Sequence, residues 1–194
     1  MIRSFGLKRL MRSAGIGLLS ALLLGAAYLA ALRLTGNFNT VIDGEFYRSG
    51  QITAQQLDDY VERYGIKTIV NLRGVNAGTS WYDKELAESH RLNVNHIDFG
   101  LSARRELSVE RATDLIAVLR SAPKPILVHC EGGADRSGLA SALYLAIVKN
   151  WKSEVAEGQL SIRFGHFSLP FIAEYSMNRS FTKLEPSLRP SAAQ

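Results

Sequence analysis

The chain has 194 residues, of which 46% are hydrophobic and 21% charged, and this composition is typical of one globular domain with some additional sequence. Its net charge of +5 arises in residues 1–34, which contain five basic residues and no acidic one, whereas residues 35–194 contain 18 of each. A nucleic-acid-binding domain needs a basic face of its own, so this balance argues against a nucleic-acid partner. The single cysteine excludes an internal disulfide, and four histidines without ligand spacing predict no metal site.

Residues 1–34 combine a basic segment with a candidate membrane anchor. Residues 13–32 (SAGIGLLSALLLGAAYLAAL) carry no charge, and at about 1.5 Å per residue they can cross a hydrocarbon core of about 30 Å. Because four basic residues precede this stretch, we expect a cytoplasmic N-terminus and a single pass through the inner membrane, with the domain in the periplasm. The alternatives are a cleaved signal peptide, which would give a secreted domain, and a buried core helix.

The predicted elements of the domain, residues 35–176, alternate between strands and helices. VIDGEFYR (41–48) predicts a hairpin that turns at Asp43-Gly44, and Thr53, Ser80 and Ser108 predict helix caps, Ser80 in a capping-box-like pair with Asp83. Strands are predicted at 66–72, 94–99 and 125–129, and helices at 53–64, 80–91, 108–120, 137–150 and 152–163. From residue 177 the pattern fades, so residues 177–194 are expected to form a flexible tail.

This alternation predicts an α/β fold with a mostly parallel central sheet flanked by helices, preceded by one N-terminal transmembrane helix. In such sheets, functional sites form at the carboxyl ends of the strands. The predicted strand 125–129 (PILVH) ends immediately before Cys130. We therefore expect this cysteine at the mouth of a site rather than in the core.

The loop CEGGADR (130–136) has the composition of an anion-binding loop. Its two glycines allow the backbone N–H groups to point inward, and the loop leads into the positive N-terminus of a predicted helix. The same field predicts that Cys130 is a thiolate that can attack phosphorus. Arg136 has the planar fork that holds two phosphate oxygens. We expect Ser137 to stabilise the thiolate as a leaving group and His129 to hold the loop by donating to its backbone. The residues expected to bind the phosphate are Glu131, Gly132, Gly133, Ala134, Asp135 and Arg136.

These residues carry a family resemblance. HCEGGADRSG (129–138) resembles the His-Cys-x5-Arg-Ser/Thr signature of the cysteine-dependent protein tyrosine phosphatase superfamily. GEFYRSGQ (44–51), GIKTIVNLRG (65–74) and GADRSGLASALYL (133–145) resemble atypical members of its dual-specificity branch, so the resemblance covers roughly residues 40–168. It implies a phosphomonoester hydrolase that works through a phosphocysteine intermediate, without a metal or another cofactor.

The resemblance also implies a general acid, and three carboxylates are candidates. Asp98 ends a predicted strand upstream of the cysteine and comes first. Asp135 comes second, because some superfamily members that act on phosphoinositides carry an acidic residue within the loop, and Glu106 comes third. Weaker candidates are Arg73, Arg104 and Arg105 as pocket lining, Trp81 and Tyr82 as an aromatic wall, and residues 159–166 (QLSIRFGH) as a polar rim. The alternative is a surface position for the arginines and packing at a helix start for Trp81 and Tyr82, while helix packing is the favoured interpretation of residues 159–166.

We therefore predict a membrane-anchored cysteine phosphatase that acts on phosphotyrosine, phosphoserine or phosphothreonine in proteins. One alternative is a phosphoinositide or inositol phosphate phosphatase, although the neutral domain argues against a highly charged inositol polyphosphate. A second is a catalytically inactive phosphate-binding module, a pseudophosphatase. A rhodanese-type sulfur-transfer enzyme also uses a loop cysteine, but the arginine spacing favours phosphate. The expected partners are the membrane and a phosphorylated protein, lipid or small-molecule substrate, and the sequence indicates no oligomeric state.

Overall fold

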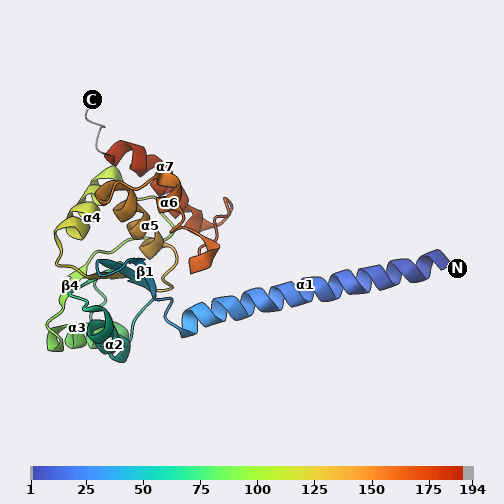
Figure 1. Ribbon diagram of the computed structural model, residues 1–194, viewed down its shortest axis with the longest axis horizontal. Helices are drawn as coiled ribbons and strands as arrows, with labels where there is room; N and C mark the ends of the chain where they lie inside the picture. The colour runs from blue at the N-terminus through green and yellow to red at the C-terminus, as the bar shows by residue number, and fades with distance from the viewer. Residues whose placement is uncertain (1, 190–194) are drawn as a thin grey trace. The chain divides into compact units, whose positions relative to one another are not determined.

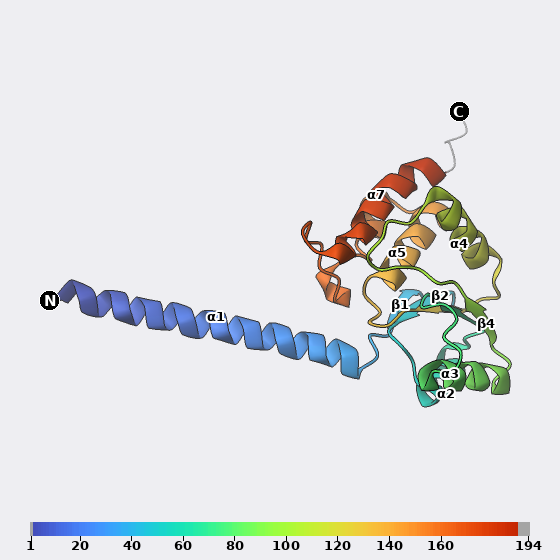
Figure 2. The same cartoon turned by 180° about the vertical axis from the view of Figure 1, so that it is seen from behind.

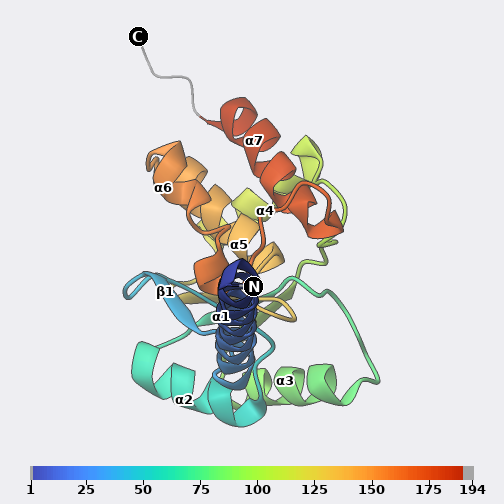
Figure 3. The ribbon, with the colours of Figure 1, turned by 90° about the vertical axis from the view of Figure 1, so that its right-hand side faces the viewer.

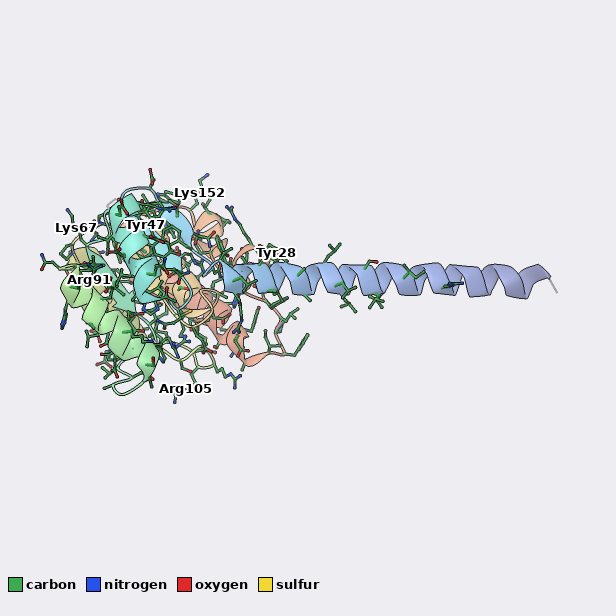
Figure 4. All side chains as sticks on the ribbon, turned by 90° about the horizontal axis from the view of Figure 1, so that it is seen from below. Tyr28, Tyr47, Lys67, Arg91, Arg105 and Lys152 are labelled. Atoms are coloured by element: carbon green, nitrogen blue, oxygen red, sulfur yellow. The ribbon has the colours of Figure 1, made fainter. Side chains whose placement is uncertain are left out.

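The computed structural model describes residues 2–189, and its internal contacts divide the chain after Thr35 into an N-terminal helix and a folded domain. The helix, α1 (Ile2–Leu34), contains an apolar segment, Ala14–Leu34, with a mean hydropathy of 2.0. None of its apolar window is buried, and the side chain that Figure 4 labels there, Tyr28, is 43% exposed. The structure therefore does not support a buried core helix. The segment has the length and composition that a membrane anchor and a signal sequence share.

Five strands form one sheet in the domain, in the order β1-β2-β5-β3-β4. The predicted hairpin is present as β1 (Asn39–Ile42) and β2 (Phe46–Ser49), which are antiparallel. The remaining strands run parallel to β2, and they are β3 (Thr68–Asn71), β4 (Asn95–Asp98) and β5 (Ile126–His129). The predicted mostly parallel α/β sheet is thus confirmed.

The four parallel strands end in register. Ser49 of β2 pairs with His129 of β5, which pairs with Asn71 of β3, which in turn pairs with Asp98 of β4. All four last residues are polar, whereas the strand interiors are largely apolar. The carboxyl edge of the sheet is therefore a row of hydrogen-bonding side chains, and it is here that the predicted site lies.

Helices cover both faces of the sheet, as Figures 1 and 3 show. One face carries α2 (Ala54–Tyr64) and α3 (Ser80–Arg91), and the other carries α4 (Val109–Ser121), α5 (Arg136–Leu143) and α7 (Ser176–Leu188). Successive side chains of a strand point to opposite faces, so Ile126 and Val128 of β5 enter the core beneath α4, α5 and α7, and Leu127 enters the core beneath α2. Figure 2 shows the same layers from behind.

Two of the three predicted helix caps are confirmed. The hydroxyl of Thr53 accepts from the backbone of α2 in a complete capping box, and the hydroxyl of Ser108 accepts from the backbone N–H of Arg111 in α4. The predicted pair of Ser80 with Asp83 is wrong. The cap residue of α3 is Thr79, and Asp83 instead accepts a hydrogen bond from the N–H of Gly78, before the helix begins.

The helices predicted after the loop are shorter or altered. The helix expected at 137–150 is α5 followed by π-helical geometry over Tyr144–Val148. The helix expected at 152–163 is reduced to α6 (Ser153–Glu157), with a 3-10 turn at Ile162–Phe164. It ends early because Gln159 turns both its backbone carbonyl and its side-chain amide oxygen toward a buried guanidinium. A second 3-10 turn, Ala173–Tyr175, leads into α7.

The flexible tail expected from residue 177 is wrong over residues 177–188, which belong to α7. Met177, Phe181 and Leu184 are each 3% exposed or less and pack with α4 and α5. Their helical spacing was masked by the polar residues between them and by Pro186, which lies in the last turn of the helix. Residues 190–194 of the predicted tail lie outside the described residues.

Candidate active site

The loop of residues 130–136 joins β5 to α5 at the carboxyl edge of the sheet, and four successive carbonyls of this loop accept hydrogen bonds from outside it. The pairs are Glu131 O with Gln51 N (3.0 Å), Gly132 O with Asn37 Nδ2 (3.0 Å), and Gly133 O and Ala134 O with Arg48 Nη2 (2.8 and 2.9 Å). In a trans peptide the C=O and the following N–H point in opposite directions. The N–H groups of residues 132–135 therefore turn to the other side of the loop, where successive donors can bind an anion.

Arg48, on β2, supports this loop, and the sequence reasoning missed it. Its guanidinium also donates to the backbone O and to Oε1 of Gln159 (2.7 and 2.9 Å) and lies 4.2 Å from the centroid of the Phe164 ring. Burial lowers the pKa of Arg48 to about 10, which leaves it charged at neutral pH. The available signal was a charged residue inside an otherwise apolar hairpin strand, in the segment GEFYRSGQ.

Only glycine fits at one of the two glycine positions of the loop. Gly133 has a φ of +71°, and a Cβ there would lie 2.5 Å from the backbone N of Gly50 and 2.7 Å from the carbonyl carbon of Ser49. A Cβ on Gly132 would meet no atom within 4 Å. The close approach of the loop to the end of β2 therefore depends on Gly133.

The structure brings together the three side chains expected to carry the chemistry. Sγ of Cys130, which is buried, lies 3.5 Å from Oγ of Ser137. Arg136 makes a long hydrogen bond from Nη1 to the carbonyl of Leu72 (3.4 Å), and its buried Nε has no hydrogen-bond partner among residues 2–189. A thiol and a hydroxyl thus lie together where α5 begins, and Arg136, the first residue of that helix, has an unused donor at Nε.

His129 is fully buried, and the expected bond to the loop backbone is wrong. Its Nε2 lies 2.9 Å from Oε1 of Glu85, on α3, and Nε2 of His96, on β4, lies 2.9 Å from the same oxygen. Gln51 donates to the other oxygen at 2.5 Å. Burial alone would raise the pKa of Glu85, but the hydrogen bonds and charges of His129 and His96 outweigh it and lower the pKa to about 2. Glu85 therefore acts as an ionised centre that links α3 to the end of β5, to β4 and to the segment after β2.

Two candidate acids accept hydrogen bonds at both of their carboxyl oxygens. Oδ1 of Asp98 accepts from the amide of Asn71 (2.7 Å) and Oδ2 accepts from the hydroxyl of Tyr82 (2.6 Å). The hydrogen bond to Asp98, together with burial, raises the pKa of Tyr82 to about 12. Glu106 pairs with Lys183 and Arg179 of α7, whose hydrogen bonds lower the pKa of its carboxyl.

The third candidate, Asp135, has a different kind of partner. Its Oδ1 lies 2.6 Å from Nδ1 of His166, whose side chain is fully buried, whereas the side chain of Asp135 is 28% exposed. His166 and Gln159 both belong to the segment expected to form a polar rim. They contact the loop and its supporting arginine from within the fold.

Of the remaining candidates, Arg73 is connected to the loop through a shared partner, Gln51. It donates to Oε1 of Gln51 (2.7 Å), and the backbone N–H of Gln51 binds the loop. Its guanidinium lies 3.6 Å from the Trp81 ring centroid. Burial lowers the pKa of Arg73. Arg104 instead pairs with Glu174 at 2.9 Å, and Arg105, labelled in Figure 4, lines a separate hollow beside the N-terminus of α4. Tyr82 is buried, so Trp81 alone can form the expected aromatic wall.

Comparisons with known proteins agree with this fold. The model of the family described as DSP-PTPase phosphatase fused to NAD+ kinase (PTP-NADK) matches residues 33–180, and no curated protein is similar enough to count as a match. TpbA of P. aeruginosa in complex with pTyr has 20% identity and a TM-score of 0.59, over 79% of this chain and 91% of that chain. The catalytic domain of the PP-IP phosphatase SIW14 from S. cerevisiae has 23% identity and a TM-score of 0.56 (73% and 83%). For PTPMT1 the values are 12% and 0.60 (78% and 95%). At such identities these structures are evidence for the fold alone.

Proposed function

The chain belongs to the PTP-NADK family of DSP-PTPase phosphatases and is a cysteine-dependent phosphatase, and on that premise we propose that it hydrolyses phosphorylated proteins through a phosphocysteine intermediate on Cys130. One observation carries this proposal. The loop after Cys130 turns the N–H groups of residues 132–135 to one side, and Arg136 adds a buried Nε without a partner among the described residues. Such an array of donors fits the oxygens of a phosphate.

In the first step, the Cys130 thiolate attacks phosphorus while the bond to the leaving oxygen breaks. Arg136 and the loop N–H groups hold the equatorial oxygens, whose charge they stabilise in the transition state. In the second step, water attacks phosphorus and the S–P bond breaks. Ser137, whose Oγ lies 3.5 Å from Sγ, donates to the departing thiolate.

We assign the general acid to Asp135 rather than to Asp98 or Glu106. Both carboxyl oxygens of Asp98 already accept hydrogen bonds within the fold, and Glu106 is ion-paired with two basic side chains of α7. A general acid must hold its proton before the leaving group departs. Asp135 lies inside the loop, where it can reach the leaving group, and it is partly exposed. Its partner is the imidazole of His166.

The proposed substrate is a phosphorylated side chain of a protein. A hollow of about 680 Å³ adjoins the loop through Gln51, and Ile52, Trp81 and Lys84 line it, so residues that flank a phosphorylated side chain have a surface to contact. The related fold of TpbA was crystallised with phosphotyrosine. The alternative is a phosphoinositide or inositol phosphate, because Asp135 occupies the loop position expected for such enzymes and SIW14 is a PP-IP phosphatase.

The test of the mechanism is turnover of 4-nitrophenyl phosphate by the full chain in detergent. Cys130→Ser should reduce kcat by about 10⁴-fold or more, because a neutral hydroxyl cannot replace a thiolate. The variant should still bind vanadate or phosphate. Residual activity within tenfold of the wild type would exclude Cys130 as the nucleophile, and an inactive wild type would favour the pseudophosphatase.

Substrate choice requires a separate comparison. Phosphopeptides, phosphoinositides in mixed micelles and soluble inositol phosphates should be hydrolysed with different kcat/KM values, and the proposal predicts the highest values for phosphopeptides. A value at least tenfold higher for a phosphoinositide would replace this substrate class with the alternative.

A further inference from the structure

A buried chain of hydrogen bonds leads from Asp135 into the protein. Nδ1 of His166 lies 2.6 Å from Oδ1 of Asp135, and Nε2 of the same ring lies 2.7 Å from Oδ1 of Asn178, on α7. Nδ2 of Asn178 donates in turn to Oγ of Ser168 (3.1 Å). The His166 side chain is fully buried. Asp135 therefore connects a partly exposed position in the loop to an imidazole that solvent does not reach.

The amide of Asn178 determines which hydrogens the imidazole carries. Because Nδ2 of Asn178 donates to Ser168, its Oδ1 faces His166, and a carbonyl oxygen can only accept. Nε2 of His166 therefore carries a hydrogen. Across the other contact, at 2.6 Å, either Nδ1 donates to a carboxylate or a carboxylic acid donates to Nδ1. A pair without that proton would place two lone pairs opposite each other, so this contact is favourable when one proton lies between Asp135 and His166.

We propose that His166 is a positioning residue that aims the carboxyl of Asp135 and keeps a proton on the pair for transfer to the leaving group. This inference rests on the proposed function. An isolated aspartate is largely ionised at neutral pH, so a general acid of this type needs a partner that retains its proton. Asp98 and Glu106 have partners that only donate to them, namely Asn71, Tyr82, Arg179 and Lys183.

The step balances with groups already present. The thiolate of Cys130 forms the S–P bond, the P–O bond to the leaving group breaks, and the proton of the pair passes through Asp135 to the leaving oxygen. Asp135 is then a carboxylate and His166 is neutral, with its hydrogen on Nε2. When water attacks phosphorus, the electrons of the S–P bond return to Sγ, one proton of the water returns to the pair, and inorganic phosphate is released.

The test compares two aryl phosphates on the full chain in detergent. His166→Asn places an amide nitrogen near the position of Nδ1, so it can still donate to Asp135, but it cannot release or hold a proton. We expect kcat for phenyl phosphate, whose leaving group is poor, to fall about tenfold to a hundredfold, which is less than the roughly 10²–10⁴-fold for a general acid itself. The effect on 4-nitrophenyl phosphate should be under threefold. The basic limb of the kcat–pH profile for phenyl phosphate should move to lower pH.

The charged groups that act on the pair from neighbouring elements are unchanged in this variant. They are Arg48 of β2, which interacts with Asp135, and Glu174 of the turn before α7, which interacts with His166. Equal loss on both substrates, with the pH profile unmoved, would reduce His166 to a structural role. If the wild-type protein itself hydrolyses neither substrate, that result contradicts the proposed phosphatase function and not this assignment alone.

A second measurement avoids a variant of the buried ring. In ¹⁵N NMR spectra of wild-type protein, Nε2 of His166 should stay protonated across neutral pH, and the Nδ1 signal should change over the same pH range as the basic limb. Asp135→Asn should shift that transition and should show the same preference between the two substrates. A ring that titrates identically with and without the Asp135 carboxyl would overturn the shared proton.

Discussion

At the scale of single residues, the carboxyl edge of the sheet depends on a few buried charges that each serve several elements. The carboxylate of Glu85 is hydrogen-bonded to two histidines and one glutamine. The guanidinium of Arg48 donates to two loop carbonyls and to Gln159. A buried charge is tolerated when such partners replace its water. Removal of either one would leave several groups without partners, so we expect these residues to be more important for stability than their number suggests.

The pH dependence of stability tests the role of Glu85. Its folded-state pKa, about 2, is below the ordinary value of 4.5, so its ionised form stabilises the fold above pH 4.5, and this contribution is lost as the pH falls toward 2. Glu85→Gln should therefore lower the free energy of unfolding by about 3 kcal/mol at pH 7, and the difference from wild type should shrink between pH 4.5 and pH 2.

Glu88→Gln, on the same helix, is the matched control. Glu88 pairs with Arg91, which is 58% exposed and is labelled in Figure 4, and an exposed ion pair of this kind contributes only about 0–1 kcal/mol. Urea unfolding followed at several pH values gives the comparison. A Glu85→Gln variant as stable as Glu88→Gln at pH 7 would show that the buried network does not depend on this charge.

At the scale of elements, the phosphate loop is shaped by what it packs against. The end of β2 approaches so closely that Gly133 is required, and Asn37, from the start of the domain, reaches both Gly132 and the carbonyl of Phe164. The loop is thus fixed by segments distant in the sequence rather than by its own composition. On the other side, α7 covers the helix that begins at Arg136.

A pair of glycine substitutions separates these effects. Gly133→Ala should lower the free energy of unfolding by about 2 kcal/mol or more, because a Cβ at positive φ would also collide with the backbone of Gly50. Gly132→Ala has open space, and its stability should stay within about 1 kcal/mol of wild type. Denaturant unfolding of both variants measures the difference, and equal stabilities would mean that the loop can retreat from β2.

At the scale of the whole molecule, the chain combines an apolar helix with a domain whose hydrophobic core lies within residues 36–189. The helix alone does not distinguish an anchor from a signal sequence. We propose an anchor through residues 13–32, with the phosphatase domain in the periplasm, because basic residues precede the apolar stretch and only Arg33 follows it closely. The substrates would then be periplasmic or at the outer surface of the inner membrane.

Reporter fusions in a Gram-negative host test this orientation. Alkaline phosphatase joined after Gln194 should be active, since that enzyme needs the oxidising periplasm, and green fluorescent protein at the same position should be dark. The chain should remain in the membrane fraction after a carbonate wash. The opposite reporter pattern would reverse the orientation, and a mature N-terminus near residue 30 would identify a signal peptide.

The fold class and a candidate centre of the site could be predicted from the amino-acid sequence alone, because both depend on local signals. Buried strands, helix caps and the spacing from Cys130 to Arg136 lie within short windows, and each has a physical meaning without knowledge of distant residues. The helix α7 escaped prediction because its apolar residues are few, and its burial depends on α4 and α5.

The polar residues that support the site became evident only in the folded structure. Arg48, Glu85 and His166 lie between 36 and 82 residues from Cys130 in the sequence, and apart from the apolar strand around Arg48, nothing near them in the chain marks them as buried. Likewise, the sequence does not show how the carboxyls of Asp98 and Asp135 differ. In the structure Asp98 accepts two hydrogen bonds and Asp135 faces an imidazole. The properties of a carboxyl depend on its neighbours in space, and those neighbours are fixed only when the sheet brings its strand ends into register.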